Sequence, residues 1–142
     1  MKRKKKNVAV YIDAENISAR KLDVINTICE REGKLISINV YRRKNDKYTK
    51  EWRNVSKKRK TMNEIMICGK PRKDKVDKKI IMDMGKDLSN NTDIDTVILF
   101  SSDHGYAEIV KEIAKNGKEV IVAGKNLSER LKTAAGVYYE ID

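Results

Sequence analysis

The chain has 142 residues, the usual size of one domain, which is long enough to bury about 70% of the surface of the unfolded chain. Lys and Arg number 32 against 21 Asp and Glu, a net charge of +11 that favours a polyanionic partner, although a solvated lysine-rich surface would give the same balance. The two cysteines, Cys29 and Cys68, lie far apart without a CxxC motif, so neither a disulfide framework nor a zinc site is indicated.

The chain begins with a basic tail at residues 1–6, and we expect one domain over residues 7–142. The tail leads into VAVYIDAEN without the long apolar segment that a signal peptide requires. No stretch approaches the ~20 apolar residues of a membrane span. We therefore expect a cytoplasmic protein with no membrane segment.

Strand and helix patterns alternate from the first domain residue onward. Short apolar runs rich in β-branched residues predict strands, and apolar residues at helical spacing predict helices. This alternation predicts an α/β fold, a three-layer αβα sandwich with a mostly parallel sheet, because parallel strands need crossovers that place helices on both faces. In chain order, we expect a strand at 7–12, a helix at 18–32, a strand at 35–41, a short helix or mobile arm at 46–60, a strand at 63–69, a helix at 74–88, a strand at 95–102, a helix at 105–115, a strand at 118–124, a helix at 128–135 and a strand at 136–141.

Basic residues gather in three segments, Lys2–Lys6, residues 42–60 and Lys70–Lys79. The second segment holds ten basic side chains against two acids. Binding of a nucleic-acid backbone favours such clusters, whereas solvation alone would spread the charges more evenly. We therefore expect nucleic-acid contacts from the following side chains: Arg42, Arg43, Lys47, Lys50, Arg53, Lys57, Lys58, Arg59, Lys73 and Lys75.

Aromatic side chains interleave with the second basic segment. Tyr41, Tyr48 and Trp52 could stack on unpaired bases, and Trp52 belongs with the candidates for nucleic-acid binding. The same aromatic side chains could equally anchor the hydrophobic core. The sequence leaves these two roles open.

Three aspartates are expected at the carboxyl ends of the strands, where parallel α/β folds bind ligands. Asp13 directly follows the first strand and Asp103 the fourth, each just before a helix, so either could be only a helix cap. Asp77 lies on the apolar stripe of the helix at 74–88, where an unpaired carboxylate is costly. Asp77 must therefore be neutral, pair with a cation or bind a metal ion.

Other polar side chains lie close to these aspartates in sequence. Asn16 suits a helix N-cap. Asp83 lies at the border of the apolar stripe, where it could reach a second metal ion or remain solvated. Ser101 and Ser102 could donate hydrogen bonds to a carboxylate or a phosphate, whereas a lone histidine at a helix start, such as His104, is more often incidental.

The blocks YIDAEN, KVDKKIIMD, ILFSSDHGY and NGKEVIVAG resemble, in order, the motifs of the NYN family of PIN-like nucleases over nearly the whole chain. The resemblance implies a metal-dependent ribonuclease acting on RNA. Carboxylate oxygens suit Mg²⁺ or Mn²⁺, and one or two such ions stabilise the charge that develops in phosphodiester hydrolysis. It implies catalytic and metal-binding roles for Asp13, Asp77 and Asp103, and supporting roles for Asn16 and Asp83, to which Ser102 is added from its place on the loop.

One departure from the family pattern leaves a second function open. Gly105 stands where the family often has another acid, so a metal ligand could be missing and the protein could be an RNA-binding adaptor without turnover. A different α/β enzyme acting on a small phosphate ester is disfavoured, because the chain has neither GxxxxGK[ST] nor GxGxxG. The RNA sequence preference and the oligomeric state, a homodimer included, stay undetermined.

Overall fold

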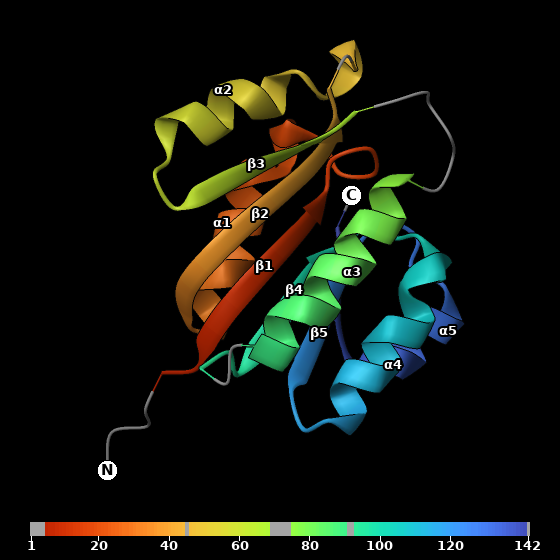
Figure 1. Cartoon of the computed structure of the whole chain (residues 1–142). Coiled ribbons are helices and arrows are strands. Elements are labelled where there is room, and N and C mark those ends of the chain that lie inside the picture. Colours follow the sequence, from red (N-terminus) through yellow and green to blue (C-terminus); the bar gives the residue numbers. More distant parts are fainter. Residues whose placement is uncertain (1–4, 45, 69–74, 91–92, 142) are drawn as a thin grey trace.

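The computed structural model describes residues 5–44, 46–68, 75–90 and 93–141, with the backbone alone for Tyr48 and Lys75. Its centre is one six-stranded sheet in which every adjacent pair of strands is parallel (Figure 1). The strands are β1 (Asn7–Asp13), β2 (Lys34–Arg43), β3 (Met62–Ile67), β4 (Thr96–Phe100), β5 (Glu119–Gly124) and β6 (Val137–Glu140).

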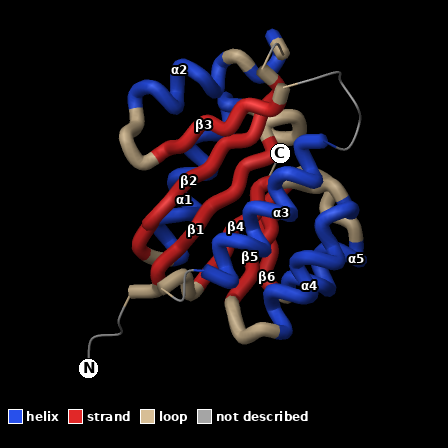
Figure 2. Tube along the Cα trace, in the orientation of Figure 1, coloured by secondary structure: helices blue, strands red, loops and turns tan. Residues whose placement is uncertain are grey.

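Helices cover both faces of the sheet, as the tube in Figure 2 shows. One face carries α1 (Leu22–Glu32) and α2 (Glu51–Lys58). The other carries α3 (Lys75–Asn90), α4 (Ala107–Lys115) and α5 (Glu129–Ala135). Short 3-10 helices precede three of these: η1 (Ala19–Lys21), η2 (Lys47–Thr49) and η3 (His104–Tyr106). The predicted three-layer α/β sandwich is confirmed, and its sheet is wholly parallel.

Two hydrophobic cores form because successive side chains of a strand point to opposite faces of the sheet. In β1, Val8, Val10 and Ile12 pack under α1 and α2. Ala9 and Tyr11 of the same strand pack under the helices of the other face. This central strand is buried on both faces, which explains why its sequence is a continuous apolar run rather than an alternating one.

The order of the strands, β3-β2-β1-β4-β5-β6, reverses direction between β1 and β4. The connection from β1 leads to β2 on one side, whereas β4 lies on the other side of β1 and the chain continues outward from it. In open parallel sheets this reversal opens a crevice at the carboxyl ends of the two strands. The residues that follow β1 and β4 therefore meet at the position where ligands bind in such folds.

Two boundaries differ from the sequence prediction in ways that affect this crevice. The strand β4 ends at Phe100, so Ser101, Ser102 and Asp103 lie in a loop and not at the strand end. Ser101 still donates its backbone N–H to Ala123, and then the chain turns. Residues 51–58 of the basic segment form a helix, so for this stretch the structure supports the predicted short helix and not the mobile arm.

None of the helices in the described part of the chain combines the length and apolar character that a bilayer crossing needs.

Candidate acidic site at the carboxyl edge of the sheet

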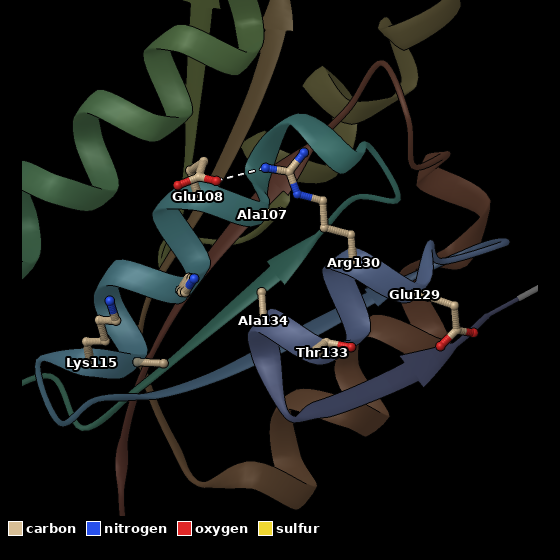
Figure 3. Close-up of a pocket in the computed structure, with 9 residues that line it drawn as sticks. Ala107, Glu108, Lys115, Glu129, Arg130, Thr133 and Ala134 are labelled. Atoms are coloured by element: carbon tan, nitrogen blue, oxygen red, sulfur yellow. Dashed lines mark hydrogen bonds and ion pairs between the residues drawn. The ribbon is translucent and has the colours of Figure 1, made fainter.

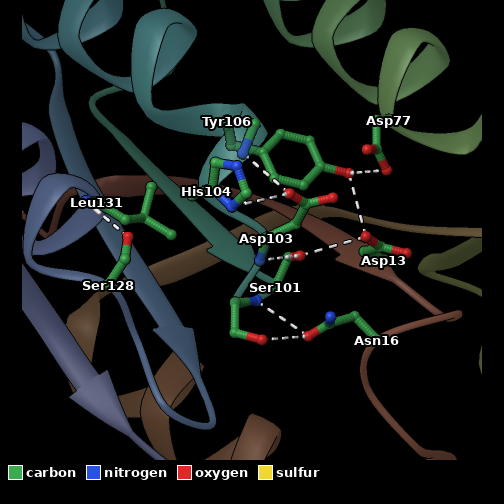
Figure 4. Close-up of polar contacts among 11 residues, drawn as sticks. Asp13, Asn16, Asp77, Ser101, Asp103, His104, Tyr106, Ser128 and Leu131 are labelled. Atoms are coloured by element: carbon green, nitrogen blue, oxygen red, sulfur yellow. Dashed lines mark hydrogen bonds and ion pairs between the residues drawn. The ribbon is translucent and has the colours of Figure 1, made fainter. Parts of the chain in front are cut away.

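Asp13 is the last residue of β1 and its side chain is buried, with 3% of the residue exposed. Its Oδ2 accepts hydrogen bonds from the hydroxyls of Ser101 and Tyr106, each at 3.2 Å (Figure 4). Its Oδ1 accepts from the backbone N–H of Glu15 at 3.2 Å. Burial raises the pKa of Asp13 to about 6, even though the hydrogen bonds from Tyr106 and Ser101 lower it.

Asp77 lies in the first turn of α3 and reaches the same crevice from that helix. The Tyr106 hydroxyl lies 3.3 Å from its Oδ1. The pKa of Asp77 is raised to about 7, mainly by partial burial and also by the nearby carboxyls of Asp103 and Asp13. The apolar stripe of α3 thus brings this carboxylate to the crevice, as its position in the sequence predicts.

Tyr106 joins the two aspartates and was not identified from the sequence. The residue is fully buried, and its hydroxyl lies between Asp13 Oδ2 and Asp77 Oδ1 (Figure 4). A hydroxyl has one proton to donate, so it hydrogen-bonds to one carboxylate at a time while remaining in contact with both. The only signal in the sequence was an aromatic residue three positions after Asp103, a pattern that a core residue gives equally well.

Asp103 is the N-cap of η3, and its Oδ1 accepts a hydrogen bond from the Gly105 backbone at 2.9 Å. The cap role is confirmed, but the carboxylate also lies close enough to Asp77 to raise the pKa of that residue. A Cβ added at Gly105 would lie 3.3 Å from Asp103 Oδ1, closer than usual. The imidazole of His104 is largely exposed, with its Nδ1 4.0 Å from the same oxygen.

Asn16 and Ser102 connect the loops that follow β1 and β4. The side-chain oxygen of Asn16 accepts hydrogen bonds from the backbone N–H and the hydroxyl of Ser102, both at 2.9 Å (Figure 4). The predicted N-cap role of Asn16 is wrong, because Ser18 caps η1 by accepting from the Arg20 backbone N–H. Asn16 instead ties the two loops together beside the aspartates.

Asp83 lies apart from the three aspartates, six residues beyond Asp77 and therefore about 9 Å further along the helix axis. Its carboxylate accepts a hydrogen bond from the Tyr41 hydroxyl at 2.8 Å and pairs with Lys79 at 3.0 Å. One turn further on, Asp87 accepts from the Tyr11 hydroxyl at 2.7 Å. These bonds fasten α3 to the neighbouring strands β1 and β2.

The oxygen donors of the three aspartates have the chemistry that Mg²⁺ or Mn²⁺ requires. Within the described residues, however, no group of three or more His, Cys, Asp or Glu side chains is spaced as ligands of a single ion. Burial is the main reason that the pKa values of Asp13 and Asp77 are raised, and for Asp77 the neighbouring carboxyls of Asp103 and Asp13 add to the rise. The carboxylate oxygens suit a divalent ion by their chemistry, but the side chains have to move before all three can bind the same ion.

The basic segment contains residues that do not fit the predicted nucleic-acid-binding role. Trp52 is 1% exposed and its Nε1 donates to the Ile17 carbonyl at 2.9 Å, so it anchors the core. Tyr41 is likewise buried. Arg42 is 3% exposed, and its Nε pairs with Glu64 of the adjacent strand at 2.6 Å. The prediction is corrected for Trp52 and Arg42, because packing takes both side chains away from solvent.

The remaining basic candidates differ in exposure and pairing. Arg43 pairs with Glu15, and Arg59 donates to the side chain of Asn26. Lys73 lies outside the described residues, as does the side chain of Lys75. The exposed candidates are Lys47, Lys50, Arg53, Lys57 and Lys58, which lie on η2 and α2 or at their ends.

A groove of about 680 Å³ lies away from the aspartates, between α4 and α5 (Figure 3). The ion pair between Glu108 and Arg130, at 2.8 Å, crosses it. Lys111 and Lys115 line it together with Glu129, so its charge is mixed. The acidic crevice, and not this groove, brings together the aspartates that the sequence predicts.

Comparisons with known proteins agree with this arrangement. The family model described as NYN domain matches residues 7–142. No curated protein matches the chain in sequence. The crystal structure of a protein of unknown function from Vibrio parahaemolyticus is similar with a TM-score of 0.77, covering 100% of this chain and 96% of that chain at 21% sequence identity. This structural likeness concerns the fold alone.

Proposed function

The chain belongs to the NYN domain family, whose members are generally nucleases, and from this premise we propose that it is a divalent-metal-dependent endoribonuclease that hydrolyses RNA phosphodiester bonds. The observation that carries the proposal is that Asp13 and Asp77 meet at the Tyr106 hydroxyl, with Asp103 beside Asp77, where the strand order reverses. We assign the activity to a single domain over residues 7–142, preceded by the basic tail at 1–6.

Asp13, Asp77 and Asp103 would hold Mg²⁺ or Mn²⁺, which when bound stabilises negative charge on the phosphate oxygens and activates water. Ser101 and Tyr106 donate hydrogen bonds to the buried Asp13 carboxylate and hold its orientation. Both Asp13 and Asp77 must release any bound proton before they can ligate a cation, because carboxylates bind metals in their ionised form.

The substrate backbone would lie against the basic face of α2. Lys50, Arg53 and Lys57 are exposed and recur at helical spacing, so they share one side of that helix. The helix follows β2 through η2 and so begins near the carboxyl edge that holds the aspartates. Cations along α2 would attract RNA toward an acidic centre that repels it, and binding should weaken as salt rises.

A second candidate function is an RNA-binding adaptor without turnover, and two observations favour it. Gly105 replaces an acid that the family often carries, and a side chain there would crowd Asp103. The three carboxylates also need to move before they can share one ion. In this alternative the basic face of α2 acts alone.

Cleavage of a labelled structured RNA with Mg²⁺ or Mn²⁺ separates the two functions. We expect Asp13→Asn and Asp77→Asn to abolish metal-dependent cleavage while retaining RNA binding, because each removes a charged ligand but no basic contact. Asp23→Asn, on the exposed side of α1, is the matched control and should cleave normally. EDTA should abolish RNA cleavage by the wild type, because it removes the divalent ion. RNA binding without cleavage under either metal would leave the adaptor as the function.

A further inference from the structure

The groove of about 680 Å³ between α4 and α5 begins close to the acidic site. Its first lining residue on α4, Ala107, directly follows η3, whose N-cap is Asp103. The helix α5 also packs against η3 (Figure 4). From there the groove runs along both helices as far as Lys115 and Ala134 (Figure 3). It therefore opens at the edge of the sheet that holds the aspartates.

The charged side chains of this groove do not cancel one another. Both of its acids are in ion pairs, Glu108 with Arg130 at 2.8 Å and Glu129 with a lysine of the same helix at 3.5 Å. Lys111 and Lys115 line the groove from the exposed side of α4. In the ranges that the structure describes, no carboxylate lies within ion-pair distance of either lysine. The groove thus offers positive charge that its own acids do not neutralise.

Small side chains line the groove between these charges. They are Ala107, Ala114 and Ala134, with the hydroxyl of Thr133 beside them. Small side chains allow a sugar–phosphate backbone to approach the helices, and a threonine hydroxyl can donate a hydrogen bond to a phosphate oxygen. The two lysines of α4 lie one helical turn apart, so both can contact the same backbone. The chemistry of the groove fits an extended strand of phosphates.

The groove and the basic face of α2 flank the acidic site on opposite sides. The helix α2 packs beside β3 on one face of the sheet, whereas α4 and α5 pack beside β5 on the other. The crevice lies between them, where β1 and β4 are adjacent. Gly124 ends β5 against the backbone of Ser101 and Ser102, and the exposed Lys125 follows it. This lysine adds positive charge close to the crevice on the side of the groove.

We propose that the groove between α4 and α5 holds the RNA backbone on one side of the scissile phosphate, while α2 holds it on the other. The inference rests on the proposed ribonuclease function and states how the substrate lies across its site. Lys111 and Lys115 bind phosphates, and the aspartates between the two basic surfaces face the bond to be cleaved. An RNA held on both sides of the crevice needs no free end there, which suits internal cleavage.

The first test measures the affinity of a labelled single-stranded RNA of about 20 nucleotides in EDTA, so that cleavage cannot interfere. Lys111→Ala combined with Lys115→Ala should reduce the slope of log affinity against log salt by between about one and two, because two phosphate contacts are lost. Lys34→Ala combined with Lys86→Ala removes the same charge from exposed positions outside the groove, and should keep the wild-type slope. Equal slopes in the two double variants would overturn the proposal.

The second test changes an acid of the groove in the same RNA-binding measurement. Glu108→Gln should tighten binding, because it removes a carboxylate that repels phosphate and releases Arg130 from its ion pair. Glu112→Gln, exposed on the same helix but outside this groove, is the matched control. We expect Glu108→Gln to increase the affinity about two- to fivefold more than Glu112→Gln does.

Two further outcomes separate the groove from the function on which it rests. Equal gains in affinity for Glu108→Gln and Glu112→Gln would overturn the place of the RNA between α4 and α5. Failure of the wild type to bind RNA would overturn the RNA substrate itself, and the groove with it. RNA binding to which Lys111 and Lys115 contribute nothing would overturn only the groove.

Discussion

The acidic crevice and the basic face of α2 handle concentrated charge in opposite ways. In the crevice, Asp13 is buried and shares the Tyr106 hydroxyl with Asp77, so each carboxylate depends on its neighbours. On α2, Arg53 and Lys57 face solvent, where water screens each charge independently. The comparison teaches that buried charge requires a partner or a ligand, whereas surface charge can be added or removed at little energetic cost.

The largest expected effect contrasts two residues of α2 that lie on opposite sides of the helix. Trp52→Ala should lower the free energy of unfolding by about 3–5 kcal/mol, because it empties a packed core site. Lys57→Ala should change it by less than about 0.5 kcal/mol. Urea denaturation measures both.

The same pair should reverse its order in RNA binding. Lys57→Ala should reduce the slope of log affinity against log salt by about one, because a phosphate contact is lost. A Trp52 variant that still folds, such as Trp52→Phe, should keep the wild-type slope. If Lys57→Ala left the slope unchanged, α2 would not be the face that holds the RNA backbone.

A smaller effect concerns pH and the crevice. Asp13 and Asp77 have pKa values of about 6 and about 7 in the folded protein, above the ordinary 3.8. The folded state therefore binds protons more tightly than the unfolded chain, and this stabilisation, complete below about pH 4, is lost as pH rises through 6 and 7. Solvent screening reduces the contribution of the partly buried Asp77, so between pH 5 and pH 8 in EDTA we expect the free energy of unfolding to fall by on the order of 2 kcal/mol.

Divalent ions and a double variant check that assignment. Mn²⁺ should restore stability at pH 8, because a ligand that binds only the folded state stabilises it. Asp13→Asn combined with Asp77→Asn should remove both the pH dependence and the response to Mn²⁺. Stability that is constant or increases between pH 5 and pH 8 in EDTA would contradict the buried-charge description of the crevice.

The smallest effect tests whether the fastening of α3 positions the crevice. Tyr41→Phe should lower the free energy of unfolding by about 1 kcal/mol, because it removes the hydrogen bond to Asp83. It should also weaken Mn²⁺ binding by a few fold, because α3 carries Asp77. Tyr139→Phe loses a comparable bond to Glu32 on the other face of the sheet, and should match the loss of stability without changing Mn²⁺ affinity. Equal Mn²⁺ affinity in both variants would reduce Tyr41 to a structural role.

The fold could be predicted well because its signals are local. The continuous apolar run of β1 and the helical spacing of apolar residues on α3 both indicate elements of a parallel α/β sheet. The approach of Asp77 to the crevice followed from the cost of a carboxylate on an apolar stripe. The position of Asp13 at the end of β1 could also be predicted, because a charged residue there ends a run of buried apolar residues.

Partners across the sheet could not be predicted in this way. The basic neighbours of Arg42 in sequence predict an RNA contact, yet the pairing of β2 with β3 places Arg42 beside Glu64 in a buried ion pair. Trp52 gave no local sign of which side of its helix would be covered. Asn16 suited a helix cap, and only the proximity of Ser102 reveals that it links two loops.

The sequence by itself determined the order of strands and helices and the aspartates that end or interrupt apolar patterns, because period and burial cost act between residues close in the chain. Only the tertiary structure decided that Tyr106 lies between Asp13 and Asp77, 93 residues and 29 residues away in sequence. It likewise decided which basic side chains remain on the surface. Such contacts depend on the order in which the strands lie side by side in the sheet, which differs from their order along the chain and is not specified by any local pattern of residues.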